Sequence, residues 1–271
     1  MTGLPLALAA SSTLILASML ALWFVSLRLR DASIVDAFWG TGFVLAAWAA
    51  ALASGALEPA RPRALLALAL VTLWGLRLTW HIHRRNAGHG EDRRYQAMRA
   101  RHGDRFGLVS LGTVFLLQGA LVILISLPLQ AAASATASPL GALDLLGAAI
   151  FLVGFLFEAL GDAQLDRFKA DPANRGKVMD RGLWRYTRHP NYFGDALLWW
   201  GFGLLGLAAG APWTLVSPAV MTWLLLRVSG VALLEKDIGE RRPAYRDYAE
   251  RTSAFVPWFP RGPRAGAEGR A

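Results

Sequence analysis

The sequence contains no cysteine in its 271 residues. Disulfide bonds, thiolate nucleophiles and cysteine-ligated metal sites are therefore excluded. The five histidines show no HExxH or comparable spacing, so we predict no metal site. Charged residues are also scarce, at 17% of the chain against ~25% in soluble domains, whereas 55% of the residues are hydrophobic. This composition indicates an integral membrane protein.

Long apolar runs recur along the chain, and each is long enough to cross a hydrocarbon core about 30 Å thick. Lipid offers no hydrogen-bond partner to backbone groups, so these runs must be helical. We predict an all-α, multi-pass membrane protein in which residues 1–260 form one domain and residues 261–271 a disordered tail. The seven expected spans are 5–27, 34–54, 64–82, 108–129, 143–165, 192–209 and 213–234.

Lysine and arginine are unevenly distributed between the loops. All but four of the 28 fall just after the first span, in 84–107, in 167–188, or from residue 236 onward. Because cytoplasmic loops collect basic residues, we expect an outside N-terminus and a cytoplasmic C-terminus, in a bacterial plasma membrane. The net charge of +9 then reports topology and not nucleic-acid binding. A short helix from Asp92 to Arg101 is expected within the first long loop.

Ionisable side chains inside the expected spans are costly and are candidates for function. Glu158, Asp162 and Asp166 lie four residues apart, so they line one face of a helix. The same topology places further polar groups in the cytoplasmic half, which indicates a polar cavity open to the cytoplasm. They are Asp36, Arg77, His81, Asp195, Arg227 and Glu235. The alternative interpretation of these polar residues is that they form structural pairs or lie at the membrane interface. Trp39 and Trp74 are candidates for stacking on a flat ligand. The alternative for these two tryptophans is that they anchor the helices at the interface.

A cluster of basic residues precedes the start of the sixth span. Lys177, Arg181 and Arg188 come before Pro190, Asn191 is expected to cap the helix, and Asp195 follows one turn later. Unpaired N–H groups at a helix start, together with arginines, suit a phosphate. The alternative is a basic cytoplasmic loop that only sets membrane orientation.

The segment Arg181-Gly-Leu-Trp-Arg-Tyr-Thr-Arg-His-Pro-Asn-Tyr-Phe-Gly-Asp195 resembles the C-terminal domain of membrane steroid 5-alpha-reductases, especially their bacterial relatives. Its core is also similar to sterol C14- and delta-7-reductases, and in a shorter form to isoprenylcysteine carboxyl methyltransferases. The resemblance covers roughly residues 30–260. The other matching segments are Ser33-Ile-Val-Asp-Ala-Phe-Trp-Gly40, Trp74-Gly-Leu-Arg-Leu-Thr-Trp-His81, Gly90-Glu-Asp-Arg-Arg-Tyr95, Pro243-Ala-Tyr-Arg-Asp-Tyr248 and Phe255-Val-Pro-Trp258.

This resemblance implies a seven-helix fold that holds NADPH on the cytoplasmic side and admits a steroid, or another flat isoprenoid enone, from the lipid. Asn191 and Asp195 match family positions near the nicotinamide carboxamide, and Asp162 matches a cofactor-binding acid beside Glu158. The basic loops and the tail are expected to hold the cofactor phosphates. The remaining residues expected in cofactor binding are Lys177, Arg181, Arg188, His189, Tyr192, Arg227, Arg241 and Tyr245.

The family's proton-donating pair is a glutamate on the second span and a tyrosine on the third. Asp36 is the nearest acid in this sequence, and the third span contains no tyrosine; Arg77 or His81 lies in that neighbourhood. The expected reaction is reduction of the delta-4 double bond of a 3-oxo-delta-4 steroid, with hydride delivered to C5 and a proton to C4. The alternatives are a methyltransferase that uses S-adenosylmethionine on an isoprenylcysteine or lipid, and a non-catalytic sterol-binding protein.

Overall fold

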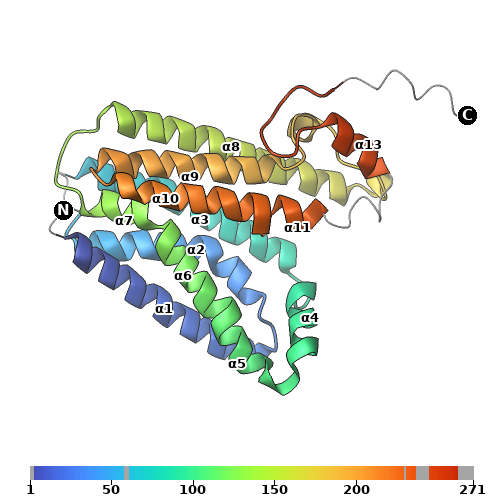
Figure 1. Ribbon diagram of the computed structural model, residues 1–271, viewed down its shortest axis with the longest axis horizontal. Coiled ribbons are helices and arrows are strands. Elements are labelled where there is room, and N and C mark those ends of the chain that lie inside the picture. Colours follow the sequence, from blue (N-terminus) through green and yellow to red (C-terminus); the bar gives the residue numbers. More distant parts are fainter. Residues whose placement is uncertain (1–2, 58–60, 229, 236–243, 262–271) are drawn as a thin grey trace, which may run out of the picture. The chain divides into compact units, whose positions relative to one another are not determined.

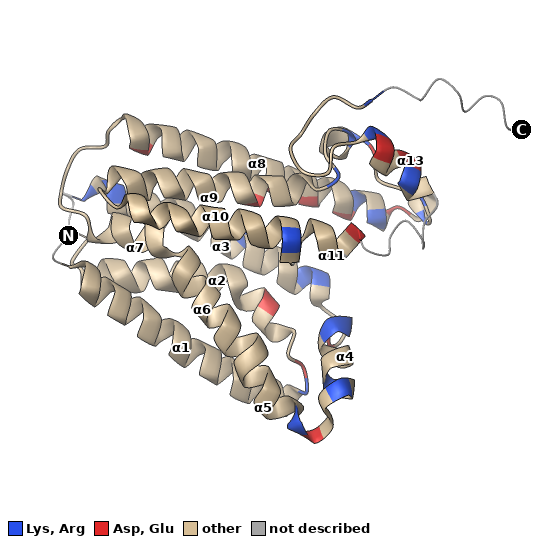
Figure 2. Ribbon diagram, viewed as in Figure 1, with Lys and Arg blue, Asp and Glu red and all other residues tan. Residues whose placement is uncertain are grey.

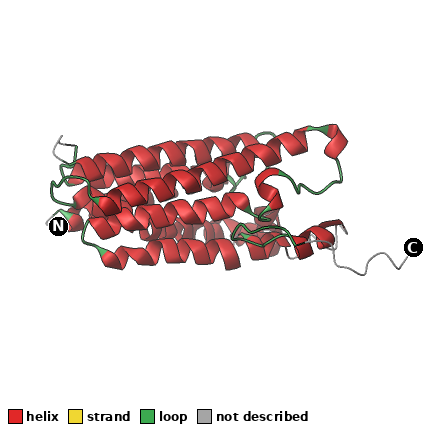
Figure 3. Cartoon of the chain, turned by 90° about the horizontal axis from the view of Figure 1, so that it is seen from above, coloured by secondary structure: helices red, strands yellow, loops and turns green. Residues whose placement is uncertain are grey.

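The computed structural model describes residues 3–57, 61–228, 230–235 and 244–261, which contain helices and no β-strand (Figures 1 and 3). The expected all-α architecture is thus confirmed for the described part of the chain. The fold divides into two compact units: unit 1 is Met1–Ala148 with Phe202–Ser217, and unit 2 is Ala149–Gly201 with Pro218–Ala271.

Five helical stretches among the described residues are long and apolar enough to cross a membrane, whereas the sequence predicted seven. They are Leu4–Leu29, Ile34–Ala53, Pro62–Asn86, Arg93–Ile125 and Ala142–Ala170. The sixth expected span forms the helix α9, Pro190–Ala208. The seventh is divided into short segments, namely η5 (Pro212–Leu215), α10 (Val216–Trp223), a π-helical turn η6 (Leu224–Val228) and α11 (Val231–Glu235).

Unit 1 is built on α1 (Leu4–Leu29), α2 (Ile34–Ala53) and α3 (Pro62–Asn86). Helices α2 and α3 approach closely because glycines face each other: a Cβ added to Gly75 would lie 2.6 Å from the carbonyl oxygen of Gly40. Next to this crossing, the fully buried rings of Phe43 and Trp74 pack with their centroids 5.6 Å apart. The small residues thus let large aromatic side chains fill the core of unit 1.

The fourth expected span, 108–129, is part of a longer, broken helical run. The run begins before the span with α4 (Arg93–His102), which confirms the predicted short helix, and continues through η1 (Gly103–Arg105) and α5 (Phe106–Ser110). A π-helical segment, η2 (Leu111–Leu116), then leads into α6 (Leu117–Ile125) and α7 (Leu127–Ser134). Pro128 lies in the first turn of α7, where its missing N–H needs no partner, so it explains why α6 ends and α7 begins there.

A buried ion pair joins two helices of unit 1 at their first turns. The guanidinium of Arg63, on α3, donates from Nε and Nη2 to the two carboxylate oxygens of Asp144 at 2.7 and 2.9 Å. Asp144 belongs to the first turn of α8 (Ala142–Ala170) and is fully buried. Such two-pronged pairs are the strongest form of charge-assisted hydrogen bond, and this one joins the starts of α3 and α8.

Unit 2 contains most of α8 and the first part of α9, followed by α13 (Ala244–Arg251). The loop between α8 and α9 carries two short 3-10 turns, η3 (Pro172–Asn174) and η4 (Gly182–Arg185). Helix α9 begins at Pro190, so Asn191 lies inside its first turn and does not cap it, contrary to the expectation from the sequence. The reason is that proline favours the first helical position, where its fixed φ is already helical.

Candidate functional site

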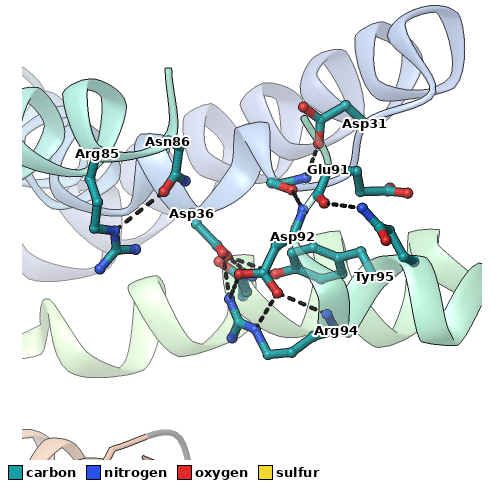
Figure 4. A network of polar contacts seen from close by, with 11 residues as sticks. Asp31, Asp36, Arg85, Asn86, Glu91, Asp92, Arg94 and Tyr95 are labelled. Atoms are coloured by element: carbon teal, nitrogen blue, oxygen red, sulfur yellow. Dashed lines mark hydrogen bonds and ion pairs between the residues drawn. The ribbon is translucent and has the colours of Figure 1, made fainter. Parts of the chain in front are cut away.

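In unit 1, polar side chains from α2 and α4 meet around the carboxylate of Asp36 (Figure 4). The hydroxyl of Tyr95 donates to Asp36 Oδ1 at 2.7 Å, and the guanidinium of Arg94 donates to Asp36 Oδ2 at 2.8 Å. Tyr95 is buried, whereas Arg94 is exposed on the outer side of the cluster. Both carboxylate oxygens of Asp36 are therefore engaged, one by a phenol and one by a cation.

Helix α4 is attached to the start of α2 by a second set of contacts. The backbone N–H of Ala32 donates to Glu91 Oε1 at 2.9 Å, and the backbone N–H of Asp92 donates to Ser33 Oγ at 2.6 Å. Glu91 in turn accepts a two-pronged pair from Arg99. Burial raises the pKa of the Glu91 carboxyl, but the hydrogen bonds from Arg99 and from the backbone of Ala32, together with the charge of Arg99, outweigh burial and lower the pKa overall.

Gln118 extends the Asp36 cluster from α6. Its Nε2 lies 3.3 Å from the hydroxyl of Tyr95 and 3.5 Å from Asp36 Oδ1. The residue follows the π-helical segment η2, and such segments shift the side chains after them around the helix axis. Three separate parts of the chain, α2, α4 and α6, thus contribute to one polar cluster.

The residues expected at the substrate come from several elements of unit 1. Asp36 is bound by side chains from α4 and α6, and Arg77 and His81 are half-buried on α3. Trp74 is fully buried in the core, and Trp39 is half-buried with its ring edge-on to Phe43.

Tyr95 is the functional candidate that the sequence reasoning missed. It lies on α4, the short helix expected within the first long loop, and not on the third span. The segment Gly90-Glu-Asp-Arg-Arg-Tyr95, already singled out by the resemblance, was the signal that could have identified it. The glutamate, aspartate and second arginine of that segment are the residues that attach α4 to α2.

In unit 2, α8 and α9 cross at a pair of glycines. A Cβ added to Gly194 would lie 2.5 Å from the carbonyl oxygen of Gly154, so no larger residue fits at that position. Further along the crossing, Asn191 Nδ2 donates to Asp162 Oδ1 at 3.1 Å. Asp162 is buried, as is Glu158 one turn earlier. The structure thus brings together Asp162 and Asn191, two of the residues expected at the cofactor.

The side chains beside this pair come from the first turns of α9. The amide oxygen of Asn191 accepts from the backbone N–H of Tyr192, and its Nδ2 carries a second proton that can reach a further acceptor. Asp195 lies one turn later and is half-buried. The ring of Tyr192 stacks on His189 with centroids 5.6 Å apart. A carboxamide has one donor group and one acceptor, so amide and carboxylate side chains on one helix end match its chemistry.

A second polar network in unit 2 centres on the carboxylate of Glu235. Arg188 donates to it from Nε and Nη2 at 2.7 and 2.8 Å, His189 donates from Nε2 at 2.9 Å, and the hydroxyl of Tyr245 lies 3.2 Å away. Arg188 also donates from Nη1 to the backbone carbonyl of Ala249 at 2.6 Å. Arg188, expected to hold a cofactor phosphate, therefore attaches the C-terminal segment to the loop before α9.

Charge and burial shift the acidity of this network in opposite directions. Burial raises the pKa of the Glu235 carboxyl. The hydrogen bonds and charges of His189 and Arg188 together outweigh burial, and they lower the pKa to about 2. Burial, and then the charge of Glu235, raise the pKa of the Tyr245 phenol. Glu235 is thus held as an anion, and Tyr245 keeps its proton.

The other residues expected at the cofactor belong to other segments of the chain. Lys177 and Arg181 are exposed on the loop after α8, where the guanidinium of Arg181 lies over the ring of Phe168. Arg227 is exposed on η6, and Arg241 lies outside the described residues. No group of three or more His, Asp or Glu side chains that could hold a metal ion occurs in the described part of the chain.

Comparison with known proteins covers the residues of both units. A protein-family model described as "Protein of unknown function (DUF1295)" matches residues 22–252. The chain is also 28% identical over 264 residues to "Uncharacterized protein C594.04c" of Schizosaccharomyces pombe, an alignment that covers 87% of this chain and 75% of that protein. No solved structure matches the chain.

Proposed function

The chain belongs to the DUF1295 family, and we propose that it is an NADPH-dependent membrane reductase that saturates the delta-4 double bond of a 3-oxo-delta-4 steroid or a similar flat enone. The observation that carries the proposal is the hydrogen bond between Tyr95 and Asp36. The resemblance to steroid 5-alpha-reductases calls for an acid paired with a tyrosine, and the tyrosine comes here from α4 and not from the third span. Orientation in a plasma membrane, with the arginine-rich ends in the cytoplasm, is part of the same proposal.

The chemistry of the enone explains why such a pair is needed. Negative charge builds on the 3-oxo oxygen as hydride adds at C5, so a fixed hydrogen-bond donor at that oxygen stabilises the transition state. A phenol carries one proton, and in the structure Tyr95 donates it to Asp36. In our proposal this proton turns to the 3-oxo oxygen when the enone binds, and Arg94 remains as the partner of the Asp36 carboxylate.

The residues of unit 2 supply the cofactor side of the proposal. NADPH, when bound, supplies the hydride. The amide of Asn191 and the carboxylates of Asp162 and Asp195 would hold the carboxamide of its nicotinamide, since their donors and acceptors complement that group. The fixed contact between Asn191 and Asp162 would select which face of the ring is presented. The Glu235 network would keep the neighbouring loop in place.

The test is turnover of progesterone by the full chain in nanodiscs with NADPH, with the product identified by mass spectrometry. We expect Tyr95→Phe to lower turnover about a hundredfold or more, because the hydrogen-bond donor is lost. Asn191→Ala should cause a loss of about the same size through misplacement of the cofactor. Tyr186→Phe is the matched control, since the exposed Tyr186 phenol has no hydrogen bond among the described residues.

Two results would count against the proposal. Full turnover by Tyr95→Phe would remove the tyrosine from the reaction. Thermal stabilisation of the protein by S-adenosylmethionine, with none by NADPH and no reduced product from any enone, would favour the methyltransferase alternative.

A further inference from the structure

The arginines of α4 and of the turn η1 that follows it fall into two sets that differ in their partners. Arg94 and Arg99 are paired with carboxylates of unit 1, namely Asp36 and Glu91. Arg93, Arg101 and Arg105 are exposed, and their side chains make no ion pair or hydrogen bond among the described residues. The segment thus has a paired set, which holds the helix, and an outward set, whose guanidinium groups have no such partner in the described part of the chain.

The outward set forms a row. Arg93, Ala97 and Arg101 follow one another at intervals of four residues, so they lie along one face of α4. Arg105 follows in the 3-10 turn η1, beyond Gly103, whose φ of 52° ends the helix. The row and the turn after it carry three positive charges, and the small, exposed Ala97 lies between the first two.

The position of α4 suits contact with a membrane surface. Within unit 1, α4 lies crosswise at the end of α3 and does not run alongside it, and its basic residues mark that end of the unit (Figures 1 and 2). Leu108, one turn after Arg105, has an exposed fraction of 75%. A crosswise helix with unpaired arginines followed by an exposed leucine has the composition of a segment that lies at the lipid headgroups.

We propose that the outward row (Arg93 and Arg101 of α4 on either side of Ala97, continued by Arg105 of η1) binds the phosphate groups of anionic phospholipids at the surface of the leaflet it faces. Arginine is suited to this because its planar guanidinium pairs with two phosphate oxygens at once. The bound lipid holds α4 in the position that brings Tyr95 to Asp36. The effect on turnover rests on the proposed function, whereas the lipid contact itself does not.

The absence of cysteine makes the lipid contact directly measurable. The single substitution Ala97→Cys introduces one thiol at the centre of the row, and a spin label attached there reports local mobility. In nanodiscs of phosphatidylcholine that contain phosphatidylglycerol, we expect the label to be immobilised relative to phosphatidylcholine alone. In the Arg93→Gln, Arg101→Gln, Arg105→Gln background the amount of phosphatidylglycerol needed should rise about fivefold for each arginine removed.

Control variants and a salt control distinguish an effect of charge from an effect of misfolding. The corresponding triple lysine variant should keep most of the effect, since the positive charge remains. About 1 M salt should abolish the effect in the parent protein, because the Debye length falls to roughly 3 Å; this measurement stands even if the glutamine variant does not fold. Unchanged immobilisation in the glutamine variant, or at high salt, would overturn the proposal.

Two further outcomes are decisive. If inorganic phosphate reproduces the immobilisation in phosphatidylcholine nanodiscs, the row is a site for free phosphate and the lipid assignment is wrong. If phosphatidylglycerol immobilises the label but no enone is ever reduced, the proposed function fails and the lipid contact stands. We expect phosphatidylglycerol to increase turnover in the parent protein and not in the glutamine variant.

Discussion

Four hydrogen bonds converge on the carboxylate of Glu235, and they connect the loop before α9 with the C-terminal segment of unit 2. This residue shows how a single charge holds distant parts of the chain together. Its donors include a guanidinium and an imidazole, so the anionic form is favoured strongly over the neutral acid. At the scale of one residue, Glu235 in unit 2 resembles Asp36 in unit 1, because each carboxylate accepts hydrogen bonds from separate parts of the chain.

The lowered pKa of Glu235 predicts a loss of stability in acid. The folded protein holds this carboxyl at a pKa of about 2, against an ordinary value of 4.5. Its contribution to the free energy of unfolding is therefore fully present above pH 4.5 and is lost as the pH falls toward 2. Thermal unfolding followed from neutral pH into this range should show the decline. Glu235→Gln should be less stable than the parent protein at neutral pH, and its stability should depend less on pH in acid.

The matched control for this experiment is Asp180→Asn. Asp180 is an exposed carboxylate of unit 2 with no hydrogen bond among the described residues. Its substitution should leave the pH dependence as in the parent protein. An acid transition that is unchanged in Glu235→Gln would show that another group is responsible.

At the scale of elements, glycines decide where helices can approach. The α2–α3 crossing of unit 1 and the α8–α9 crossing of unit 2 are both made at facing glycines. Each crossing lies within two turns of a polar residue of interest, Asp36 on α2 and Asp162 on α8. Close helix packing through small residues is common inside membranes, where no hydrophobic effect drives helices together.

We predict that Gly75→Ala destabilises the protein by about 1–3 kcal/mol, because the added methyl group overlaps the backbone of α2. Gly112→Ala is the matched control, since no atom lies within 4 Å of a Cβ added there. It should be neutral or stabilising by up to about 1 kcal/mol. Thermal unfolding of both variants in the same detergent would measure the difference; equal stability would mean that the crossing is not tightly packed.

At the scale of the whole molecule, the basic residues predict which loops face which side of the membrane. The distribution of lysine and arginine predicts that the loops 84–107 and 167–188 share one side and that residues 130–142 lie on the other. Among the described residues, five helical stretches are long and apolar enough to cross the membrane.

Single cysteines in this cysteine-free chain test the orientation. A membrane-impermeant maleimide should label Ala137→Cys in intact cells, but should label Ala97→Cys and Asp180→Cys only after the membrane is opened. All three positions are exposed, so a lack of labelling would not reflect burial in the protein. Labelling of Ala97→Cys and Asp180→Cys on opposite sides would require an odd number of crossings between them and would contradict the predicted topology.

Local properties of the sequence determined the membrane class, the helical architecture and the short helix in the first long loop. These follow from apolar length and periodicity. Asp162 and Asn191 were assigned to one cofactor site only through the family resemblance. Only the tertiary structure decided that Tyr95 reaches Asp36, 59 residues away along the chain, and that Arg188 is bound by Glu235. The physical reason is that a side chain's partner depends on how helices cross, and glycine contacts and π-helical turns set those crossings without leaving a period in the sequence.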